Sequence, residues 1–210
     1  MTGYIKKPTN KPMKRLSLYL FLILFTLQTP SLADDIRDFQ IEGMSVGDSL
    51  LDYFSKSQIQ KKEKNAFLYK DKKFIIIWSP SNLKVYEKSS IVYKYKPRDK
   101  KYIVHGIDGK IVFPNDIKGC KEKMKEIKSE LDTVFKDAKK KTKDGKKHGY
   151  DKSGKSKTYG TAYFLNSGGY VDLYCTDWSK KLTKKNKWQD QLTVLIGSQE
   201  YLEYLNLAYK

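Results

Sequence analysis

Apolar residues recur at alternating steps of three and four between Ile117 and Val134, and lysines and glutamates fill most positions between them. This period is typical of a helix with one apolar stripe and one charged face, and it predicts a helix from Ile117 to Phe135. Asn115 or Asp116 can cap its first turn. The stripe must be buried against the rest of the chain, and its members are Ile117, Cys120, Met124, Ile127, Leu131 and Val134.

Before this helix, the pattern predicts a short first helix and then strands. Residues 34–41 form an extended lead-in. Ser45 and Asp48 have the spacing of a capping box and predict a helix that ends near Ser57. Residues 73–79 are a continuous apolar run rich in isoleucine, which indicates a buried strand.

Further strand-like segments lead to the central helix. Residues 84–96 predict one broken strand or two short ones, and 101–105 and 111–113 predict two more. Asp108-Gly109, between these last two, is a hairpin-turn signal. We therefore expect a hairpin immediately before the central helix.

The segment after the central helix contains three more expected strands and a final helix. Residues 161–165 and 170–178 alternate as strands do, and the Asn-Ser-Gly-Gly sequence between them is a strong hairpin signal. The third strand is expected at 188–196, after a basic loop at 180–187. Ser198 can cap the final helix.

The expected order is therefore helix, three strands, helix, three strands, helix (α-βββ-α-βββ-α). Short turns between neighbouring strands imply antiparallel pairing. The sequence predicts one α+β domain over residues 34–210, with antiparallel sheet(s) of about six to seven strands and amphipathic helices packed on one face.

Residues 1–33 have the pattern of a secretory signal peptide. A basic lead precedes an apolar run from Leu16 to Leu27, which is shorter than the about 20 residues that a membrane-spanning helix needs. Small residues at Ser31 and Ala33 suit a cleavage site, so we expect cleavage after Ala33 and a periplasmic or secreted protein. A membrane anchor is the alternative. The basic lead consists of Lys6, Lys7, Lys11, Lys14 and Arg15.

Cys120 and Cys175 are the only cysteines. In an exported protein an even pair predicts a disulfide. Cys175 shares one face of its strand with Val171 and Leu173, and Cys120 lies in the apolar stripe of the helix. We therefore expect both side chains in one core. Two buried free thiols are the alternative.

The chain is strongly basic, with 42 Lys and Arg residues against 24 Asp and Glu residues and a formal net charge of +18 at pH 7. Only Arg15, Arg37 and Arg98 are arginines. This argues against a nucleic-acid partner, because bidentate contacts to bases and phosphates favour arginine.

The lysines are densest at 136–157, and there we expect a solvent-exposed loop or flap. Such a flap could bind a protein or an anionic envelope component such as lipid, lipopolysaccharide or peptidoglycan. Near a lipid surface each lysine contributes about 1 kcal/mol. A solvated lysine face without a ligand is the alternative. The candidate anion-binding lysines are Lys139, Lys140, Lys141, Lys143, Lys146, Lys147, Lys152 and Lys155.

Residues 149–156 match the phosphate-binding pattern G-x-x-x-x-G-K-[ST]. That chemistry requires a buried strand before the first glycine and a helix after the last residue. Here the preceding residues are lysine-rich and do not indicate a strand, and those that follow alternate like a strand. We therefore expect no nucleotide site.

Other chemistry has little support in the sequence. His105 and His148 are the only histidines, no pair of ligands has a short metal spacing, and no cofactor is expected. The nucleophile elbow G-x-S-x-G is missing, and His105 is expected on a strand surface. Asp172, Asp177 and Glu200 would form a carboxylate pair only by the accident of folding. We predict no catalytic residue.

Four segments resemble a family of uncharacterised exported proteins from marine Gram-negative bacteria. They are 38–55 (DFQIEGMSVGDSLLDYFS), the helix start at 115–120, 151–156 (DKSGKS) and 174–179 (YCTDWS). The resemblance covers essentially the whole mature chain and implies export and a shared fold, but no activity. Residues 41–51 also resemble the helix opening of small outer-membrane-assembly lipoproteins with a β-lactamase-inhibitor-like fold, whose lipidated cysteine this chain lacks.

Three hypotheses for the function follow. The first is a non-catalytic periplasmic or cell-envelope binding or interaction module with a basic surface, on which Tyr93, Tyr95 and Tyr102 could line a glycan-binding sheet face or belong to ordinary strands. The second is an envelope-polymer hydrolase with unidentified carboxylates, and the third is an inhibitor-like or assembly-factor-like module. A deep pocket lined by acids with raised pKa values would favour the enzyme.

Overall fold

The structure, a computed structural model, describes residues 35–79, 83–96 and 100–208, so the expected signal peptide and its cleavage site lie outside the described residues. Its strands are β1 (Gln40–Ile41), β2 (Met44–Ser45), β3 (Phe67–Leu68), β4 (Phe74–Trp78), β5 (Lys88–Lys94), β6 (Val104–Val112), β7 (Lys139–Lys147), β8 (Lys157–Phe164), β9 (Tyr170–Asp177) and β10 (Gln191–Gly197). Its helices are α2 (Lys56–Glu63), α3 (Ile117–Val134), α4 (Lys180–Asn186) and α5 (Gln199–Ala208), with short 3-10 helices η1 (Ile36–Asp38) and η2 (Leu50–Asp52).

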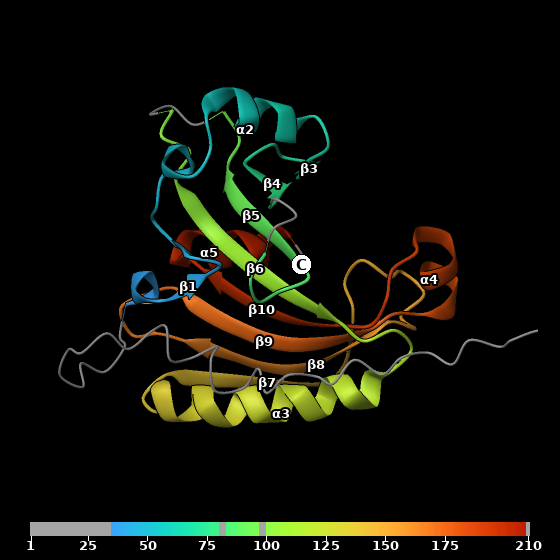
Figure 1. Ribbon diagram of the computed structural model, residues 1–210. Helices are drawn as coiled ribbons and strands as arrows, with labels where there is room; N and C mark the ends of the chain where they lie inside the picture. Colours follow the sequence, from blue (N-terminus) through green and yellow to red (C-terminus); the bar gives the residue numbers. More distant parts are fainter. Residues whose placement is uncertain (1–34, 80–82, 97–99, 209–210) are drawn as a thin grey trace, which may run out of the picture.

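One antiparallel sheet of eight strands organises the molecule, in the order β3-β4-β5-β6-β10-β9-β8-β7 (Figure 1). A separate two-stranded ribbon, β1-β2, lies beside it. The predicted α+β class with antiparallel pairing is therefore confirmed. The sheet has more strands than expected because the lysine-rich segment adds β7 at one edge and the chain before β4 adds β3 at the other.

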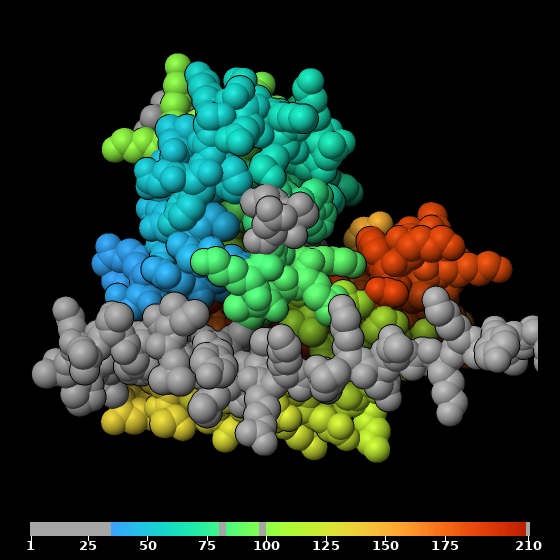
Figure 2. All heavy atoms as spheres, in the orientation of Figure 1, coloured from blue at the N-terminus to red at the C-terminus, as the bar shows by residue number. Residues whose placement is uncertain are grey.

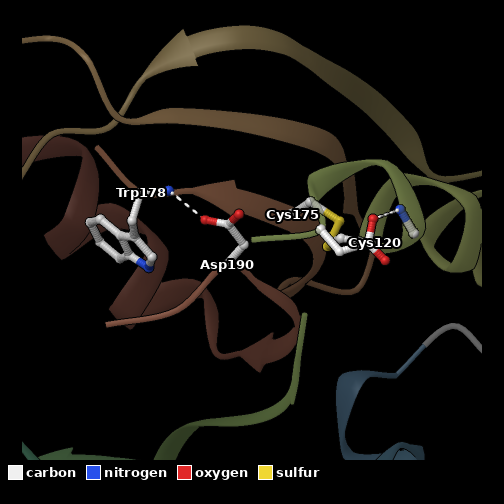
Figure 3. The surroundings of a disulfide bond; sticks show 6 residues. Cys120, Cys175, Trp178 and Asp190 are labelled. Carbon is white, nitrogen blue, oxygen red and sulfur yellow. Dashed lines mark hydrogen bonds between the residues drawn. A yellow bond between two sulfur atoms is a disulfide. The ribbon is translucent and has the colours of Figure 1, made fainter. Parts of the chain in front are cut away.

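The central helix lies where the sequence predicts it, as α3, and it covers β8, β9 and β10. Cys120, Ile127 and Leu131 are the buried members of its stripe. Asp116 caps the helix, because its carboxylate accepts a hydrogen bond of 2.8 Å from the Gly119 amide. The predicted disulfide is also confirmed: Cys120 in α3 is bonded to Cys175 in β9, with their Cα atoms 6.1 Å apart (Figure 3).

The last helix packs on the opposite face of the sheet, so the prediction that all helices share one face is wrong. Neighbouring residues of a strand point to opposite faces. In β4, Ile75 belongs to the large core that also contains the α3 stripe, whereas Phe74 belongs to a second core with Tyr201 and Tyr204 of α5. The continuous apolar run at 73–79 was the signal for this, since a strand covered on both faces needs no alternation.

The first helix begins later than predicted. The Ser45 amide does donate to the Asp48 carboxylate, at 2.8 Å, but the chain there forms β2 and then η2. Gly47 has a φ of +96°, and its amide donates to the Val104 carbonyl rather than to a helical partner. A true capping box forms at Ser55, where α2 starts. Tertiary hydrogen bonds therefore override the local helix signal.

The expected hairpin at Asp108-Gly109 is also wrong, because β6 runs straight through both residues between β5 and β10. Gly109 serves close packing instead of a turn. A Cβ atom there would lie 2.5 Å from the ring of Tyr86.

Loss of the disulfide should destabilise the fold by about 4 kcal/mol, because the bridge closes a loop with a sequence separation of 55 and the chain-entropy model assigns roughly this value to such a loop. Urea unfolding of the double variant Cys120→Ser/Cys175→Ser, compared with the oxidised protein, measures the loss. A reducing agent should weaken the unsubstituted protein by a similar amount and leave the double variant unchanged. Equal stability with and without the reducing agent in both proteins would contradict the prediction.

Candidate functional site

The lysine-rich segment expected as a flap forms an edge strand. β7 pairs with β8 from Lys139 opposite Phe164 to Lys147 opposite Lys157, and nearly all its side chains are exposed. The expectation of a loop is therefore wrong over 139–147. An edge strand that buries neither face has no apolar alternation to reveal it, and lysines there discourage pairing with other chains.

The eight candidate lysines do not form one site. Strand geometry sends Lys140 and Lys143 to opposite faces, where Lys140 pairs with Asp132 at 2.9 Å and Lys143 pairs with Asp172 at 2.5 Å. Lys139 and Lys141 lie toward one end of the strand. Four others lie at the opposite end or in the turn to β8, namely Lys146, Lys147, Lys152 and Lys155.

That turn belongs to a cluster of aromatic rings at the far end of the sheet. The ring centroids of His148 and Trp178 are 4.5 Å apart, those of Trp178 and Trp188 are 4.6 Å apart, and those of Tyr150 and Trp188 are 5.0 Å apart. Tyr150 is 56% exposed. Burial lowers the pKa of His148. The four rings therefore form a continuous, uncharged aromatic row at neutral pH.

Helix α4 follows this row, although the sequence predicts a basic loop at 180–187. Its lysines are exposed and lie between Trp178 and Trp188 along the chain, and Lys187 ends the helix in the left-handed region with a φ of 59°. Among the described residues, no carboxylate forms an ion pair with these lysines. We call the four rings together with these lysines the aromatic–lysine end; its helix α4 projects from the body of the molecule (Figure 2). The lysines are Lys180, Lys181, Lys184, Lys185 and Lys187.

Asp151 fixes the shape of this end. Its carboxylate accepts hydrogen bonds from the amide and the hydroxyl of both Ser153 and Ser156, at 2.6 to 3.0 Å, and these bonds lower the pKa of Asp151. The Ser156 hydroxyl oxygen in turn accepts from the Ser179 amide at 3.0 Å, which ties the turn to the start of α4. The match to the phosphate-binding pattern is thus a turn between two strands, and no helix follows it.

A second anchor lies on the other side of the rings. The Asp190 carboxylate accepts a hydrogen bond of 2.9 Å from the Trp178 amide (Figure 3). Trp178 directly follows β9, the strand that carries Cys175, so the disulfide and Asp190 both fix where the aromatic row begins.

Two carboxylates share the sheet face that α5 partly covers. Asp108 and Asp172 lie on either side of Leu195 in the cross-strand register, which separates them by two strand spacings, about 10 Å. Burial raises the pKa of Asp172. Each is held by a lysine, Asp108 by Lys110 at 2.6 Å and Asp172 by Lys143 at 2.5 Å. The other carboxylate oxygen of Asp172 is buried and has no hydrogen-bond partner among the described residues.

The other suggested chemical groups are dispersed. Glu200 pairs with Lys73 and Lys94 and does not meet Asp172. His105 is not on the surface as expected, because its side chain is only 14% exposed and makes a 3.1 Å hydrogen bond with Ser198 at the start of α5. These contacts position α5 against β6.

The tyrosines considered for a glycan-binding face belong to the core. Tyr93 is fully buried and Tyr102 is 9% exposed, and their rings meet edge to face at 5.7 Å. Tyr95 packs against the same core. These tyrosines therefore pack in the core, as the alternative of ordinary strand composition expects, and do not line an exposed glycan-binding face.

An apolar cavity of about 210 Å³ lies between α3, the sheet and the β1-β2 ribbon. The lining residues include Ile41, Tyr86, Ile127, Leu131, Phe135, Val171, Val194 and Ile196.

Within the part of the chain that the structure describes, no three His, Cys, Asp or Glu side chains gather as a metal site, and no helix is long and apolar enough to cross a membrane. Comparisons of the chain with protein-family models, curated proteins and solved structures found no match. The geometry of the candidate sites therefore carries the functional argument.

Sequence reasoning missed the aromatic–lysine end because its four rings come from three separate segments. Only the density of Trp, Tyr and His among lysines between 146 and 188 signalled it. Spacing along the chain could not show that Tyr150 and Trp188 are neighbours, since strands β8 and β9 and helix α4 separate them.

The attachment of β7 to α3 should depend on pH through Asp132. Burial acts to raise the pKa of Asp132, but hydrogen bonds from Lys128, Lys140 and Tyr163 outweigh it and lower the pKa to about 2. Because this lies below the ordinary value of 3.8, the carboxylate stabilises the fold at neutral pH, and the contribution is lost as the pH falls through the folded pKa.

Asp132→Asn should therefore lower the free energy of unfolding at neutral pH by about 1 kcal/mol, a modest value because solvent screens the partly exposed ion pairs. It should also flatten the loss of stability between about pH 4 and pH 2. Urea unfolding over this range measures both effects. The control is Asp137→Asn, an exposed residue without an ion pair among the described residues. Equal pH dependence in both variants would show that Asp132 is not the titrating group.

Proposed function

We propose that the protein is a non-catalytic cell-envelope binding module that attaches to an anionic, phosphate-bearing lipid surface through its aromatic–lysine end. The observation that carries the proposal is the chain of four rings beside exposed lysines that lack ion pairs among the described residues. Tryptophan and tyrosine favour the boundary between apolar and aqueous phases, and lysines near it add electrostatic attraction to anionic lipids.

The distribution of charge supports binding in preference to catalysis. The carboxylates on the sheet, Asp108 and Asp172, each form an ion pair with a lysine, whereas the α4 lysines form no ion pair among the described residues. At the aromatic–lysine end the charged side chains of α4 are all lysines and all exposed, whereas Asp151 and Asp190 are buried and accept hydrogen bonds from the chain. The disulfide supports an oxidising compartment, where such an envelope surface would be met.

The test uses the mature chain that the sequence predicts, Asp34–Lys210, in sedimentation with vesicles. Binding to phosphatidylglycerol vesicles is expected at low salt, and it should fall steeply as added salt shortens the screening length. Vesicles of phosphatidylcholine should not bind. Lipopolysaccharide in place of phosphatidylglycerol distinguishes the two sources of lipid phosphate.

Substitution of Lys180, Lys181, Lys184 and Lys185 by Gln should weaken binding at least about 100-fold, since each lysine contributes on the order of 1 kcal/mol. The matched control makes the same change in net charge at four exposed lysines in and near α2, at Lys56, Lys61, Lys64 and Lys70. Equal weakening by both sets would show that net charge and not this site drives binding. Vesicle binding that ignores salt, or no binding, would refute the proposal.

A further inference from the structure

The cavity beneath the β1-β2 ribbon has apolar walls and a polar mouth. Its floor is formed by β9 and β10, through Val171, Val194 and Ile196, and one wall is formed by α3, through Ile127 and Leu131, and by Phe135 directly after it. The lining residues that are exposed mark the mouth, and they are Gln40, Gly43 and Lys84. A long apolar side chain or an alkyl chain could enter here with its polar end left in water.

The roof of the cavity is built by a specific device. Glu42 and Gly43 turn the β1-β2 ribbon with positive φ angles of 55° and 81°, as a tight hairpin requires. The Glu42 carboxylate then accepts hydrogen bonds from the amides of Lys84, Val85 and Tyr86, at 2.8, 2.8 and 2.9 Å. These bonds hold the ribbon to a segment about forty residues away and keep both over the opening.

The charge at the mouth favours an anion. Both Glu42 oxygens are occupied by backbone amides, so the carboxylate is engaged within the roof. The Lys84 side chain is exposed and forms no ion pair among the described residues. An anionic head group beside the mouth would therefore meet a lysine and would have its alkyl chain aligned with the apolar walls.

We propose that this cavity binds the alkyl chain of a single-chain amphiphile with an anionic head group, the head lying beside Lys84. An apolar cavity of about 150 Å³ holds a benzene ring, so a cavity of 210 Å³ has room for about eight carbon atoms. An alkyl chain that fills it removes its own apolar surface and that of the walls from water. The cavity and the aromatic–lysine end have no residue in common, so alkyl-chain binding is independent of the proposed lipid-surface binding.

The probes are sodium octanoate and octyl phosphate, which share the chain and differ in the head group, added to the mature chain. Methyl-resolved NMR of the unsubstituted protein should show shifts at Val171, Val194, Ile127 and Leu131. A length series of carboxylates should gain about fourfold in affinity per methylene and level off near eight carbons. Octanol should bind the unsubstituted protein more weakly than octanoate does. Octanoate should bind the Lys84→Gln variant more weakly than it binds the unsubstituted protein. Lys88→Gln is the matched lysine control.

Val194→Phe places a ring in the cavity and should abolish octanoate binding while it raises the melting temperature. Retained binding in this variant, or methyl shifts located elsewhere, would overturn the proposed site. If no probe at millimolar concentration shifts the lining methyls, the cavity is a dry packing gap and the proposal fails. Should Val194→Phe not fold, the methyl map and the chain-length series of the unsubstituted protein decide the question by themselves.

Discussion

Burial of the α3 stripe against the sheet, pinned by Cys120–Cys175, is the constraint on which the other features depend. The helix lies over β8, β9 and β10 and forms one wall of the cavity. Its Asp132 holds Lys140 of β7, which attaches the edge strand to the body. The bonded cysteine in β9 lies three residues before Trp178, so the same bridge fixes the base of the aromatic–lysine end. A shift of α3 along the sheet would therefore disturb all three.

Features specified by periodicity were predictable from the sequence. The predicted helix with a buried apolar stripe is present as α3, because the stripe needs only a broad apolar sheet face, which any neighbouring strands could supply. The pairing of Cys120 with Cys175 followed from two independent periodicities that placed both side chains in one core. In both cases the period of the element determined the outcome, and the details of the partner did not matter.

Features that depend on a particular partner were not predictable. Asp108-Gly109 has the composition of a hairpin turn, but in the structure Gly109 leaves space for the ring of Tyr86. Tyr86 is distant in the sequence, and only the fold brings it close to Gly109. Ser45 and Asp48 form their local hydrogen bond, but the Gly47 amide is taken by Val104. The clamp of Glu42 on residues 84–86 gave no local signal at all, because a carboxylate that accepts backbone amides can come from any position.

The contrast between paired and unpaired charge carries the functional argument furthest. Where the chain half-buries a carboxylate on the sheet, it supplies a lysine within about 3 Å, as at Asp108 and Asp172, because an unpaired charge there would be costly. At α4 and at Lys84, exposed lysines have no carboxylate partner among the described residues. Solvent lowers the cost of an unpaired lysine, so exposure alone would permit this arrangement. Solvation does not explain why the α4 lysines lie beside an aromatic row or why Lys84 lies beside an apolar cavity. Each place combines an apolar surface with positive charge, which is the combination that binds an anionic amphiphile.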